Sequence, residues 1–464
     1  MDLTSYNVFA IVYWVILSIV LIRTLQGSIA LLSVISWLKR KNLASPPSYP
    51  SAKHTIYVVI PVLREQKIIE STVNYFLNLD YPADLLKLIL VSTEKEIAEQ
   101  KNPEEETTMN LIKRICQERS DSRIVHLHYQ DPKGKMVDQL NFAFGYLTRK
   151  SGAKMEKTFA AVYNADSRPH RKTFSLISDL AEAKGGRVYQ QSSVYFNNFS
   201  EVEDKNGFFA AKYIKTNALL QTRWTIVHEI PRLLRQSYFL SKKHLRLFLA
   251  HCVGHGLFLR GDLLKELKEM PTGTVTEDLF FGYVLSLLGE PIFPVPLLEG
   301  AEVPVIFRNT LQQKYVWFFG PLDHLKYSSY FKFKFPQKTS IYLRSWFTFQ
   351  GLIPAVAWFC SGWFFILIVT FPLLAGNWLL FWLGLALFII NAPLSYLFIL
   401  VNHKFISRIS SGSENICALD FLWIVLLSPI AVFLHSLPPW LTLYRSVVSV
   451  FTNKYPQKPK TERS

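Results

Sequence analysis

The stretch Thr158-Phe-Ala-Ala-Val-Tyr-Asn-Ala-Asp-Ser-Arg168-Pro169 places one carboxylate, Asp166, just after a short apolar run. A run of this length predicts a buried β-strand, and the polar residues and proline after it predict a turn. In α/β folds, ligands bind outside the carboxyl ends of the strands. We therefore expect Asp166 to face a ligand at the open edge of a sheet. An aspartate here also fits a helix N-cap or a simple turn.

The sequence around this stretch alternates between strand-like and helix-like segments. Apolar or β-branched runs predict strands at 56–60, 85–91, 124–127, 159–163 and 187–191. Helical spacing predicts helices at 65–79, 103–119, 134–147, 205–250 and 276–288. Strands separated by helices indicate a mostly parallel sheet with helices on both faces. The predicted fold class of residues 55–305 is therefore α/β.

The composition indicates a membrane protein rather than a soluble enzyme. Of the 464 residues, 50% are hydrophobic, and the formal net charge is +16. Basic residues flank the apolar segments, as in cytoplasmic loops of membrane proteins, so we favour a membrane surface over nucleic acid as the partner of this charge. The four cysteines are scattered without metal-ligand spacing, which indicates isolated thiols in a reducing compartment.

The N-terminal segment at residues 3–22 carries no charged side chain and is long enough to cross a bilayer. Apolar residues continue to Leu38, and Lys39-Arg-Lys41 follows. We find no small-residue cleavage site, so we interpret residues 1–41 as an uncleaved transmembrane anchor. The basic cluster places the next domain in the cytoplasm. The proline-containing residues 42–54 are expected to form a linker.

The C-terminal third is expected to return to the membrane. Residues 306–344 mix aromatic and basic side chains, which suits amphipathic helices at the water–lipid interface. Residues 345–402 carry no charge and predict two spans joined at Ala375-Gly-Asn377. In the remainder of the transmembrane region, 345–452, we expect a hairpin or re-entrant turn at Pro438-Pro439. That turn would return the basic tail, 453–464, to the cytoplasm.

Two acidic motifs suit chemistry on a phosphorylated sugar. A divalent metal held by Asp166 would neutralise a leaving diphosphate, since Mg²⁺ commonly uses one or two carboxylates plus substrate phosphates. Glu277 and Asp278 lie at a predicted helix start, where a carboxylate can serve as a general base for an acceptor hydroxyl. Acids in a first helical turn also complement the helix dipole without any catalytic role.

Three further motifs offer binding groups. Lys133-Gly-Lys135 precedes a predicted helix and can meet phosphate oxygens, although a solvated lysine loop fits as well. Gly254-His-Gly256 can expose an imidazole to a substrate, while a lone histidine is commonly structural. Gln313 and Trp317 can bind and stack on a sugar, or belong to an interfacial aromatic belt. The sequence contains no GxGxxG, GxSxG, P-loop or HExxH motif.

In this order, the motifs resemble those of membrane-integrated glycosyltransferases of family 2, the group that includes cellulose, hyaluronan and poly-N-acetylglucosamine synthases and many non-processive relatives. The resemblance covers nearly the whole chain, and Thr276-Glu-Asp278 is identical to the Thr-Glu-Asp motif of that family. It implies a GT-A (Rossmann-like) fold. It also implies site residues: catalytic Asp278 and Glu277; nucleotide-binding Pro61, Glu65, Glu94, Lys135, Asn141 and Asn164; metal-binding Asp166; and Gly254, His255, Gly256, Gln313 and Trp317 for acceptor or product.

Three positions depart from the family pattern. The run Leu90-Val-Ser-Thr-Glu-Lys-Glu96 lacks the uracil-binding aspartate, for which Glu94 is the candidate substitute. Asn164 replaces the first acid of the Asp-x-Asp metal motif. Val316 stands where the Gln-x-x-Arg-Trp motif has arginine, which loosens the analogy to the processive synthases.

The resemblance implies an inverting hexosyltransferase that moves a sugar from a nucleotide-sugar donor, with UDP favoured, to a hydroxyl of a lipid-linked or polysaccharide acceptor. The expected cofactor is Mg²⁺ or Mn²⁺, and the expected location is the cytoplasmic face of the inner or plasma membrane. Membrane lipids and proteins of a polysaccharide pathway are expected partners, and nucleic acid is not. Two alternatives stay open: a processive synthase that also translocates its polymer, and a nucleotide-binding membrane scaffold.

Overall fold

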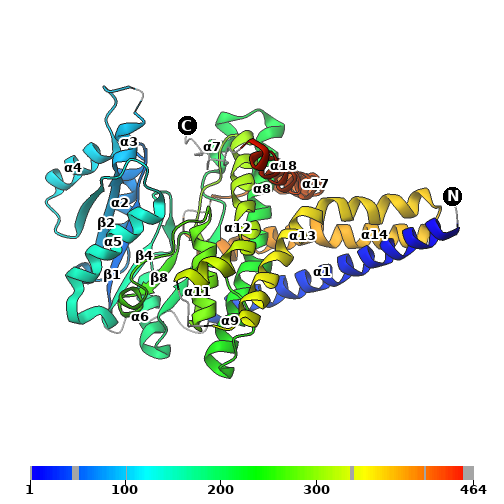
Figure 1. The fold of residues 1–464 in the computed structure, drawn as a ribbon. Coiled ribbons are helices and arrows are strands. Elements are labelled where there is room, and N and C mark those ends of the chain that lie inside the picture. Colours follow the sequence, from blue (N-terminus) through cyan, green and yellow to red (C-terminus); the bar gives the residue numbers. More distant parts are fainter. Residues whose placement is uncertain (1–2, 44–51, 101, 335–338, 412–413, 453–464) are drawn as a thin grey trace.

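The computed structural model describes residues 3–43, 52–100, 102–334, 339–411 and 414–452 (Figure 1). An α/β body carries a long helical arm that projects from one side. Most of the expected linker and the whole tail at 453–464 lie outside the described residues.

The strands are β1 Thr55–Pro61, β2 Leu86–Thr93, β3 Ile124–Tyr129, β4 Thr158–Val162, β5 Arg168–Pro169, β6 Val188–Gln190, β7 Ser193–Val194, β8 Leu257–Arg260, β9 Ile292–Pro294 and β10 Glu299–Gly300. The helices of the body are α2 Ile69–Leu77, α3 Glu94–Ala98, α4 Thr108–Arg119, α5 Met136–Ser151, α6 Thr173–Lys184, α7 Phe199–Lys205, α8 Phe208–Trp224, α9 Ile230–Lys243, α10 Gly261–Leu267, α11 Glu277–Leu288 and α12 Phe307–Lys334. The long apolar helices and their neighbours are α1 Leu3–Leu43, α13 Ile341–Leu374, α14 Trp378–Ile389, α15 Ser395–Val401, α16 His403–Ile409, α17 Ala418–His435 and α18 Leu437–Thr452.

The larger sheet has seven strands in the order β3-β2-β1-β4-β8-β6-β9. Strands β1 to β4 run parallel, whereas β8 is antiparallel to both β4 and β6. Val162 ends β4 and pairs with Leu257, the first residue of β8. This reversal brings the loop before β8 to the edge where β4 ends. The predicted α/β class, with a mostly parallel sheet, is confirmed.

Some element boundaries differ from the sequence prediction. The helix expected at 65–79 begins only at Ile69, since Arg64 has a left-handed φ of 56° and Ile68 departs from helical geometry with a φ of −121°. The helical stretch expected at 205–250 ends at Lys243, where His244 adopts a left-handed φ of 53°. Residues after it run extended toward β8, and this segment contributes to the site.

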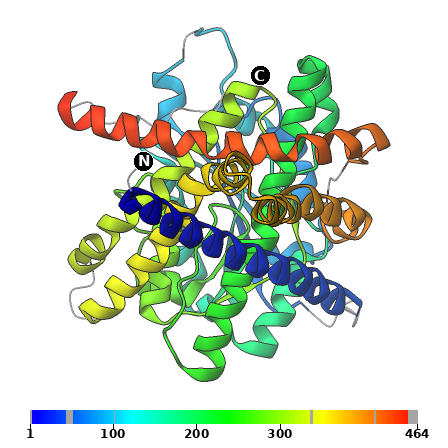
Figure 2. The ribbon, with the colours of Figure 1, turned by 90° about the vertical axis from the view of Figure 1, so that its right-hand side faces the viewer.

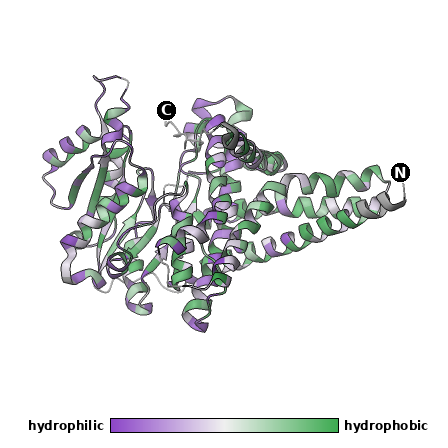
Figure 3. Cartoon of the chain, in the orientation of Figure 1, coloured by the Kyte–Doolittle hydropathy of each residue, from purple (hydrophilic) through white to green (hydrophobic). Residues whose placement is uncertain are grey.

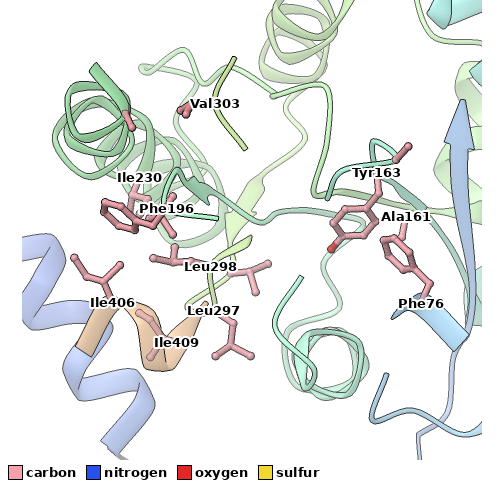
Figure 4. Close-up of a cluster of buried hydrophobic side chains, with 14 of the residues drawn as sticks. Phe76, Ala161, Tyr163, Phe196, Ile230, Leu297, Leu298, Val303, Ile406 and Ile409 are labelled. Atoms are coloured by element: carbon pink, nitrogen blue, oxygen red, sulfur yellow. The ribbon is translucent and has the colours of Figure 1, made fainter. Parts of the chain in front are cut away.

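One hydrophobic core joins the sheet to the C-terminal helices. Figure 4 shows Phe76 and Tyr163 on one side of this core, and Leu298 with Ile406 on the other. The Leu298 N–H also donates to the carbonyl of Ile409, at 2.8 Å. The body and the apolar helices therefore share one buried core, which fixes their relative positions.

The arm consists of α13, α14 and the first half of α1. Tyr13, Leu17 and Val20 of α1 pack against Ile368 of α13 and Leu387 of α14. Hydrophobic residues follow the arm along its length (Figure 3). Helix α1 has 41 residues and is about 60 Å long at ~1.5 Å per residue, twice the ~30 Å hydrocarbon core of a bilayer. Its second half therefore continues from the arm along the body.

The break between the two long C-terminal helices lies where the sequence predicted it. Helix α13 ends at Leu374 and α14 begins at Trp378, with Gly376 at a φ of 67°. Asn377 Oδ1 accepts a hydrogen bond from the Leu380 N–H at 3.2 Å and so caps α14. By length and composition, the described chain has four candidate membrane spans: 10–42, 341–374, 378–401 and 418–448.

The fourth candidate span is oriented differently from α13 and α14. In Figure 2, which looks along the arm toward the body, parts of α13 and α14 are seen almost end-on, α1 runs obliquely across the view, and α17 and α18 run straight across it. The hairpin expected at Pro438-Pro439 is not formed, because α18 starts at Leu437 and continues the course of α17. A proline lacks only its own N–H, which the first helical turn leaves unpaired in any case.

Helix α17 is fixed to the body by a buried ion cluster. Asp420 accepts hydrogen bonds from Lys212 Nζ at 2.6 Å and from Lys215 Nζ at 2.8 Å. Glu203 Oε1 lies 2.6 Å and 2.9 Å from the same two ammonium groups. Removing Asp420 would leave two buried cations undercompensated, a change that commonly costs about 3–5 kcal/mol.

Candidate active site

Asp166 lies in a tight turn at the carboxyl end of β4. The turn is fixed by two hydrogen bonds: the Ser167 N–H donates to the carbonyl of Asn164, and the Asn164 N–H donates to Ser167 Oγ, each at 3.1 Å. Thr72 Oγ1 donates to the carbonyl of Ala165 from the neighbouring helix. The strand and turn predicted around Asp166 are thus formed, and the carboxylate stands on a rigid support.

The Gly254-His-Gly256 loop reaches the same edge of the sheet from β8. The Gln190 side chain holds this loop, accepting from the Val253 N–H at 3.0 Å and donating to the His255 carbonyl at 2.8 Å. Gly256 has a φ of 65°, and an added Cβ would lie 2.5 Å from the Gln191 carbonyl oxygen. The positive φ and the lack of space for a Cβ together explain why the motif has glycine at position 256.

His255 forms a buried charge pair with Glu299 of β10. Its Nδ1 lies 3.0 Å from Glu299 Oε2 and 3.2 Å from Ser193 Oγ. Burial acts to lower the pKa of His255, but the carboxylates of Glu299, Asp166 and Glu229 outweigh it and raise this pKa to about 9. At neutral pH the site therefore contains an imidazolium cation among carboxylates.

Asp278 lies in the first turn of α11, directly beside this loop. A Cβ built on Gly254 would lie 3.3 Å from Asp278 Oδ2. Gly282, one turn later in the helix, approaches so closely that a Cβ there would lie 2.4 Å from the Cys252 backbone nitrogen. The close packing of helix and loop thus positions the Asp278 carboxylate next to Gly254. Glu277 shares the same first turn.

Helix α12 covers the start of α11. A Cβ on Gly320 would lie 2.5 Å from Thr276 Oγ1, so the two backbones are in close contact. Trp317 precedes Gly320 by one turn, lies on the same helical face and is 37% exposed. Gln313, one turn earlier again, accepts a hydrogen bond from Gln221 Nε2 at 3.4 Å. Val316 is buried in packing.

The expected nucleotide-binding residues lie at the ends of the first strands. Pro61 ends β1, Glu65 follows in the next loop, and Glu94 begins α3 after β2. Glu94 Oε2 lies 2.9 Å from Nε2 of His128, a residue of β3. Because parallel strands deliver their carboxyl ends to one edge, these residues share an edge with Asp166.

Two expected phosphate-site residues have structural contacts. Lys135 is the N-cap residue of α5, and its backbone N–H donates to Asp138 Oδ2 at 2.7 Å. Asn141 exchanges two hydrogen bonds with the backbone of Met270, at 2.7 Å and 3.1 Å. The amide of Asn141 thus ties α5 to the segment before Thr276. Its expected contact with a nucleotide stays a prediction.

Sequence reasoning missed three of the polar residues that build the site. Gln190 and Glu299 are fully buried and hold the loop before β8. Glu299 ends the apolar run Val295-Pro-Leu-Leu298, which is the same signal that selected Asp166. Glu96 is buried in the short helix α3 after β2, and its carboxylate accepts hydrogen bonds from the Arg64 and Thr108 backbone N–H groups. Glu96 thus connects segments that are distant in the sequence, and these contacts could not be predicted without the three-dimensional fold.

Comparisons with solved structures find two glycosyltransferases of low sequence identity to this chain. The structure is similar to a mannosyltransferase, PcManGT from Pyrobaculum calidifontis, solved with GDP-Man and Mn²⁺, at 15% identity over 91% of this chain and 99% of that chain, with a TM-score of 0.40. It is also similar to residues 1–349 of TarS from S. aureus, at 12% identity over 70% of this chain and 89% of that chain, with a TM-score of 0.33. A comparison with curated proteins finds no match.

Family models cover most of the chain. Residues 53–316 match the model described as "Glycosyltransferase like family 2", and residues 223–436 match "Glycosyl transferase family group 2". The chain is therefore a glycosyltransferase, and its sheet, acidic turn and covering helices form a GT-A fold. The first match spans more than half of the sequence. The chain therefore belongs to glycosyltransferase family 2.

Proposed function

We propose that the protein is an inverting glycosyltransferase that uses a nucleotide-sugar donor, with UDP favoured, and a hydroxyl acceptor at the membrane. The observation that carries the proposal is the convergence of three elements on one edge of the sheet: the Asp166 turn after β4, the Gly254–Gly256 loop before β8, and Asp278 at the start of α11. These elements are far apart in sequence, and the reversed strand β8 brings them together.

In the proposed reaction the acceptor hydroxyl oxygen attacks the anomeric carbon of the donor. Asp278 takes the hydroxyl proton, and the bond from the anomeric carbon to the nucleoside diphosphate breaks with its electron pair leaving on the diphosphate. Attack from the face opposite the leaving group inverts the configuration. A base within hydrogen-bond reach contributes about 10²–10⁴ in rate.

The donor set at Asp166 fits a divalent metal that the substrate completes. Within the described residues, no group of three or more His, Cys, Asp and Glu side chains is arranged to hold a metal alone. Mg²⁺ or Mn²⁺ commonly takes one or two carboxylates plus phosphate oxygens. Asp166 and the Asn164 amide oxygen would be the protein ligands. Such an ion, when bound, neutralises charge on the diphosphate.

The His255 imidazolium is proposed to supply a second positive charge near the leaving group. Its charge is maintained by Glu299, and it lies close enough to Asp166 for each to influence the other. This cation would stand in for the arginine that Val316 replaces in helix α12. A fixed charge aimed at a developing negative charge is effective because it needs no reorganisation during the reaction.

The acceptor is proposed to be a lipid-linked sugar or a polysaccharide end at the cytoplasmic face of the inner or plasma membrane. Trp317 and Gln313 belong to α12, which contacts both α11, where Asp278 lies, and the apolar helices α13 and α18. We favour limited or single transfer over processive synthesis. Three arm helices that pack on one another through Tyr13, Leu17 and Ile368 do not form the wall of a wide channel.

A donor screen tests this function. Purified full-length protein would be incubated with a panel of sugar nucleotides and Mg²⁺ or Mn²⁺, and diphosphate release and product anomer would be measured. Asp278→Asn should lose about 10²–10⁴ of the rate, since an amide cannot accept the proton. The exposed Asp84→Asn is the matched control. Full activity in Asp278→Asn, or a product with retained configuration, contradicts the proposal.

A further inference from the structure

A cavity of about 170 Å³ lies at the base of the arm, outside the site described above. Its walls come from the middle of α1, the end of α8 and the segment that joins α14 to α15. One part of the wall is polar, with Thr24, Ser28 and Asn391, and another is apolar, with Leu31 and Phe398. A wall divided in this way fits a ligand with a polar group and a hydrocarbon chain.

Arg223 supplies the charge of this cavity. Its Nε donates to Ser395 Oγ at 2.9 Å and its Nη2 donates to Asn391 Oδ1 at 3.1 Å. Nη2 also lies beside Gly27, 3.7 Å from where a Cβ would be. Both hydrogen-bond partners are neutral, and Arg223 forms no ion pair with the described acids. A guanidinium group among apolar helices without a carboxylate partner has an uncompensated charge, and an anionic ligand would compensate it.

The surroundings of Arg223 add positive charge. Burial, followed by the combined effect of Arg232, Arg223, Arg23 and Arg235, lowers the pKa of His228 well below its ordinary value. All four guanidinium groups therefore disfavour protonation of His228, while the buried Glu229 offsets part of the charge of Arg232. This excess of cations would attract phosphate, which takes two hydrogen bonds at once from a guanidinium fork.

Two π-helical turns meet at the cavity. One, η3, spans Thr225–Glu229, and the other, η4, spans Ile390–Leu394. Arg223 lies two residues before the first, and its hydrogen bond to Asn391 joins it to the second. Pro231 and Pro393 lack the backbone N–H groups that a regular α-helix would use, so these prolines favour the local departure from α-helical hydrogen bonding. π-turns are rare and frequent at functional sites.

The cavity is accessible to membrane lipids if the arm crosses the bilayer, because its residues on α1 and on the segment after α14 belong to the candidate spans 10–42 and 378–401. Residues 3–22 of α1 are uncharged and about 30 Å long at ~1.5 Å per residue, which matches the hydrocarbon core. Thr24 and Ser28 lie just beyond this uncharged stretch, after Arg23. The apolar residues Ile390 and Leu394 of the opposite wall belong to the segment that continues the arm helix α14.

We propose that this cavity binds the phosphate group of a membrane lipid through Arg223, with the lipid chain lying against Leu31, Leu394 and Phe398. The occupant is a lipid phosphate rather than free phosphate, because about half of the lining residues are apolar, namely Leu31, Leu32, Ile390, Leu394 and Phe398. The proposal concerns binding and holds whether or not this lipid is also the acceptor of the sugar.

The test measures binding to the purified full-length protein in neutral detergent by native mass spectrometry and thermal unfolding. Four probes are compared: phosphatidylglycerol, a long-chain isoprenyl phosphate, diacylglycerol and inorganic phosphate. The two lipid phosphates should bind and raise the unfolding temperature, while diacylglycerol and inorganic phosphate should not. Tighter binding of the isoprenyl phosphate would identify a carrier lipid as the source, and equal binding a bulk phospholipid.

Three variants distinguish lipid binding in the cavity from nonspecific attraction to the positive charge of the protein. Arg223→Gln should weaken lipid-phosphate binding at least tenfold, whereas Arg149→Gln, an exposed arginine of α5, should bind as the native protein does. Ser28→Trp keeps the charge but fills the cavity, and it should also lose binding even if Arg223→Gln fails to fold. Native-like binding by Ser28→Trp, or inorganic phosphate binding as tightly as the lipids, would overturn the proposal. Because binding is read directly, this result is independent of transferase activity.

Discussion

At the scale of single residues, Glu299 controls the charge of the site through His255. Because the pKa of His255 is raised to about 9, the imidazolium is lost only as pH rises through that value. Glu299→Gln removes the carboxylate that contributes most to this rise. We expect the basic limb of the pH–activity profile to move from about 9 to lower pH by one unit or more.

The measurement is the rate of transfer against pH for the native protein, Glu299→Gln and the exposed control Glu118→Gln. The control should keep the native profile. The ion pair between His255 and Glu299 also contributes to the free energy of unfolding. This contribution is fully present below the pKa of histidine in the unfolded chain, and it is lost as pH rises through the pKa of His255 in the folded protein. Identical basic limbs in native and Glu299→Gln enzyme would show that the charge of His255 is not used.

Lys314 is a second residue with a pH-dependent effect. It is fully buried in α12, where its ammonium donates to Asn217 Oδ1, and burial lowers its pKa to about 7. Between pH 7 and the unfolded value near 10.5, the unfolded chain binds more protons, so native stability rises with pH by up to about 1.4 kcal/mol per unit.

Replacing Lys314 by methionine should remove this dependence. We expect Lys314→Met to unfold at a higher temperature than the native protein at pH 6, with the difference shrinking toward pH 9. Lys332→Met, an exposed lysine of the same helix, is the control and should change neither value. A constant difference across pH 6–9 would mean that Lys314 is not the titrating group.

The residues that we propose to take part in the chemistry were easier to predict from the sequence than the residues that hold them in place. Asp166 and Asp278 follow recognisable local signals, namely a strand end and a helix start. Gln190 and Glu299 act on a loop about 65 and 44 positions away, respectively. Such partners depend on sheet register, which a single sequence does not define.

At the scale of elements, the contact between α11 and the loop before β8 decides the geometry of Asp278. Gly282→Ala would place a Cβ 2.4 Å from the Cys252 nitrogen and force helix and loop apart. We expect a loss of about 1–3 kcal/mol of stability and a large loss of activity. Thermal unfolding and transfer rate measure the two effects.

Gly145→Ala in α5 is the matched control, because it is also a glycine inside a helix. Its added Cβ would meet only Arg149 Nη1, at 3.6 Å. Alanine there should be neutral or stabilise by up to about 1 kcal/mol, the usual gain over glycine in a helix. Equal behaviour of the two variants would mean that the tight contact does not position Asp278.

Elements with strong periodicity were predicted well, and short or reversed ones were not. The strands at β1, β2 and β4 and the turn between α13 and α14 match the predictions closely. The small strands β5, β7 and β10 have two residues each and leave no pattern. The antiparallel direction of β8 is a property of pairing, so its consequence for the site could not be read from the sequence.

At the scale of the whole molecule, the course of α17 and α18 bears on membrane topology. If α1, α13 and α14 cross the bilayer and α17–α18 lie along its surface, the chain crosses three times. The exposed stripe Leu419, Leu422, Leu426 and Ile430 on α17 suits a helix lying in the interface. The basic tail would then end on the side of the catalytic body, as positive-inside predicts.

A reporter fused after residue 464 tests this arrangement. We expect a cytoplasmic reporter such as a fluorescent protein to be active at the C-terminus, and a periplasmic or extracellular phosphatase reporter to be inactive there. The same pair fused at the N-terminus should give the opposite result. Phosphatase activity at the C-terminus would mean that α17–α18 crosses the membrane.

The ion cluster of Lys212, Lys215 and Asp420 constrains the order in which this protein can be assembled. Lys215 and Asp420 are 205 positions apart, so at about 5–20 residues per second the ribosome needs roughly 10–40 s to supply the partner. During that interval Glu203, which precedes both lysines in the chain, is the acid of the cluster that can pair with them. The packing of α8 against α17 can be completed only after Asp420 has been made, so we expect a nascent chain stalled before Asp420 to expose the face of α8 that α17 covers.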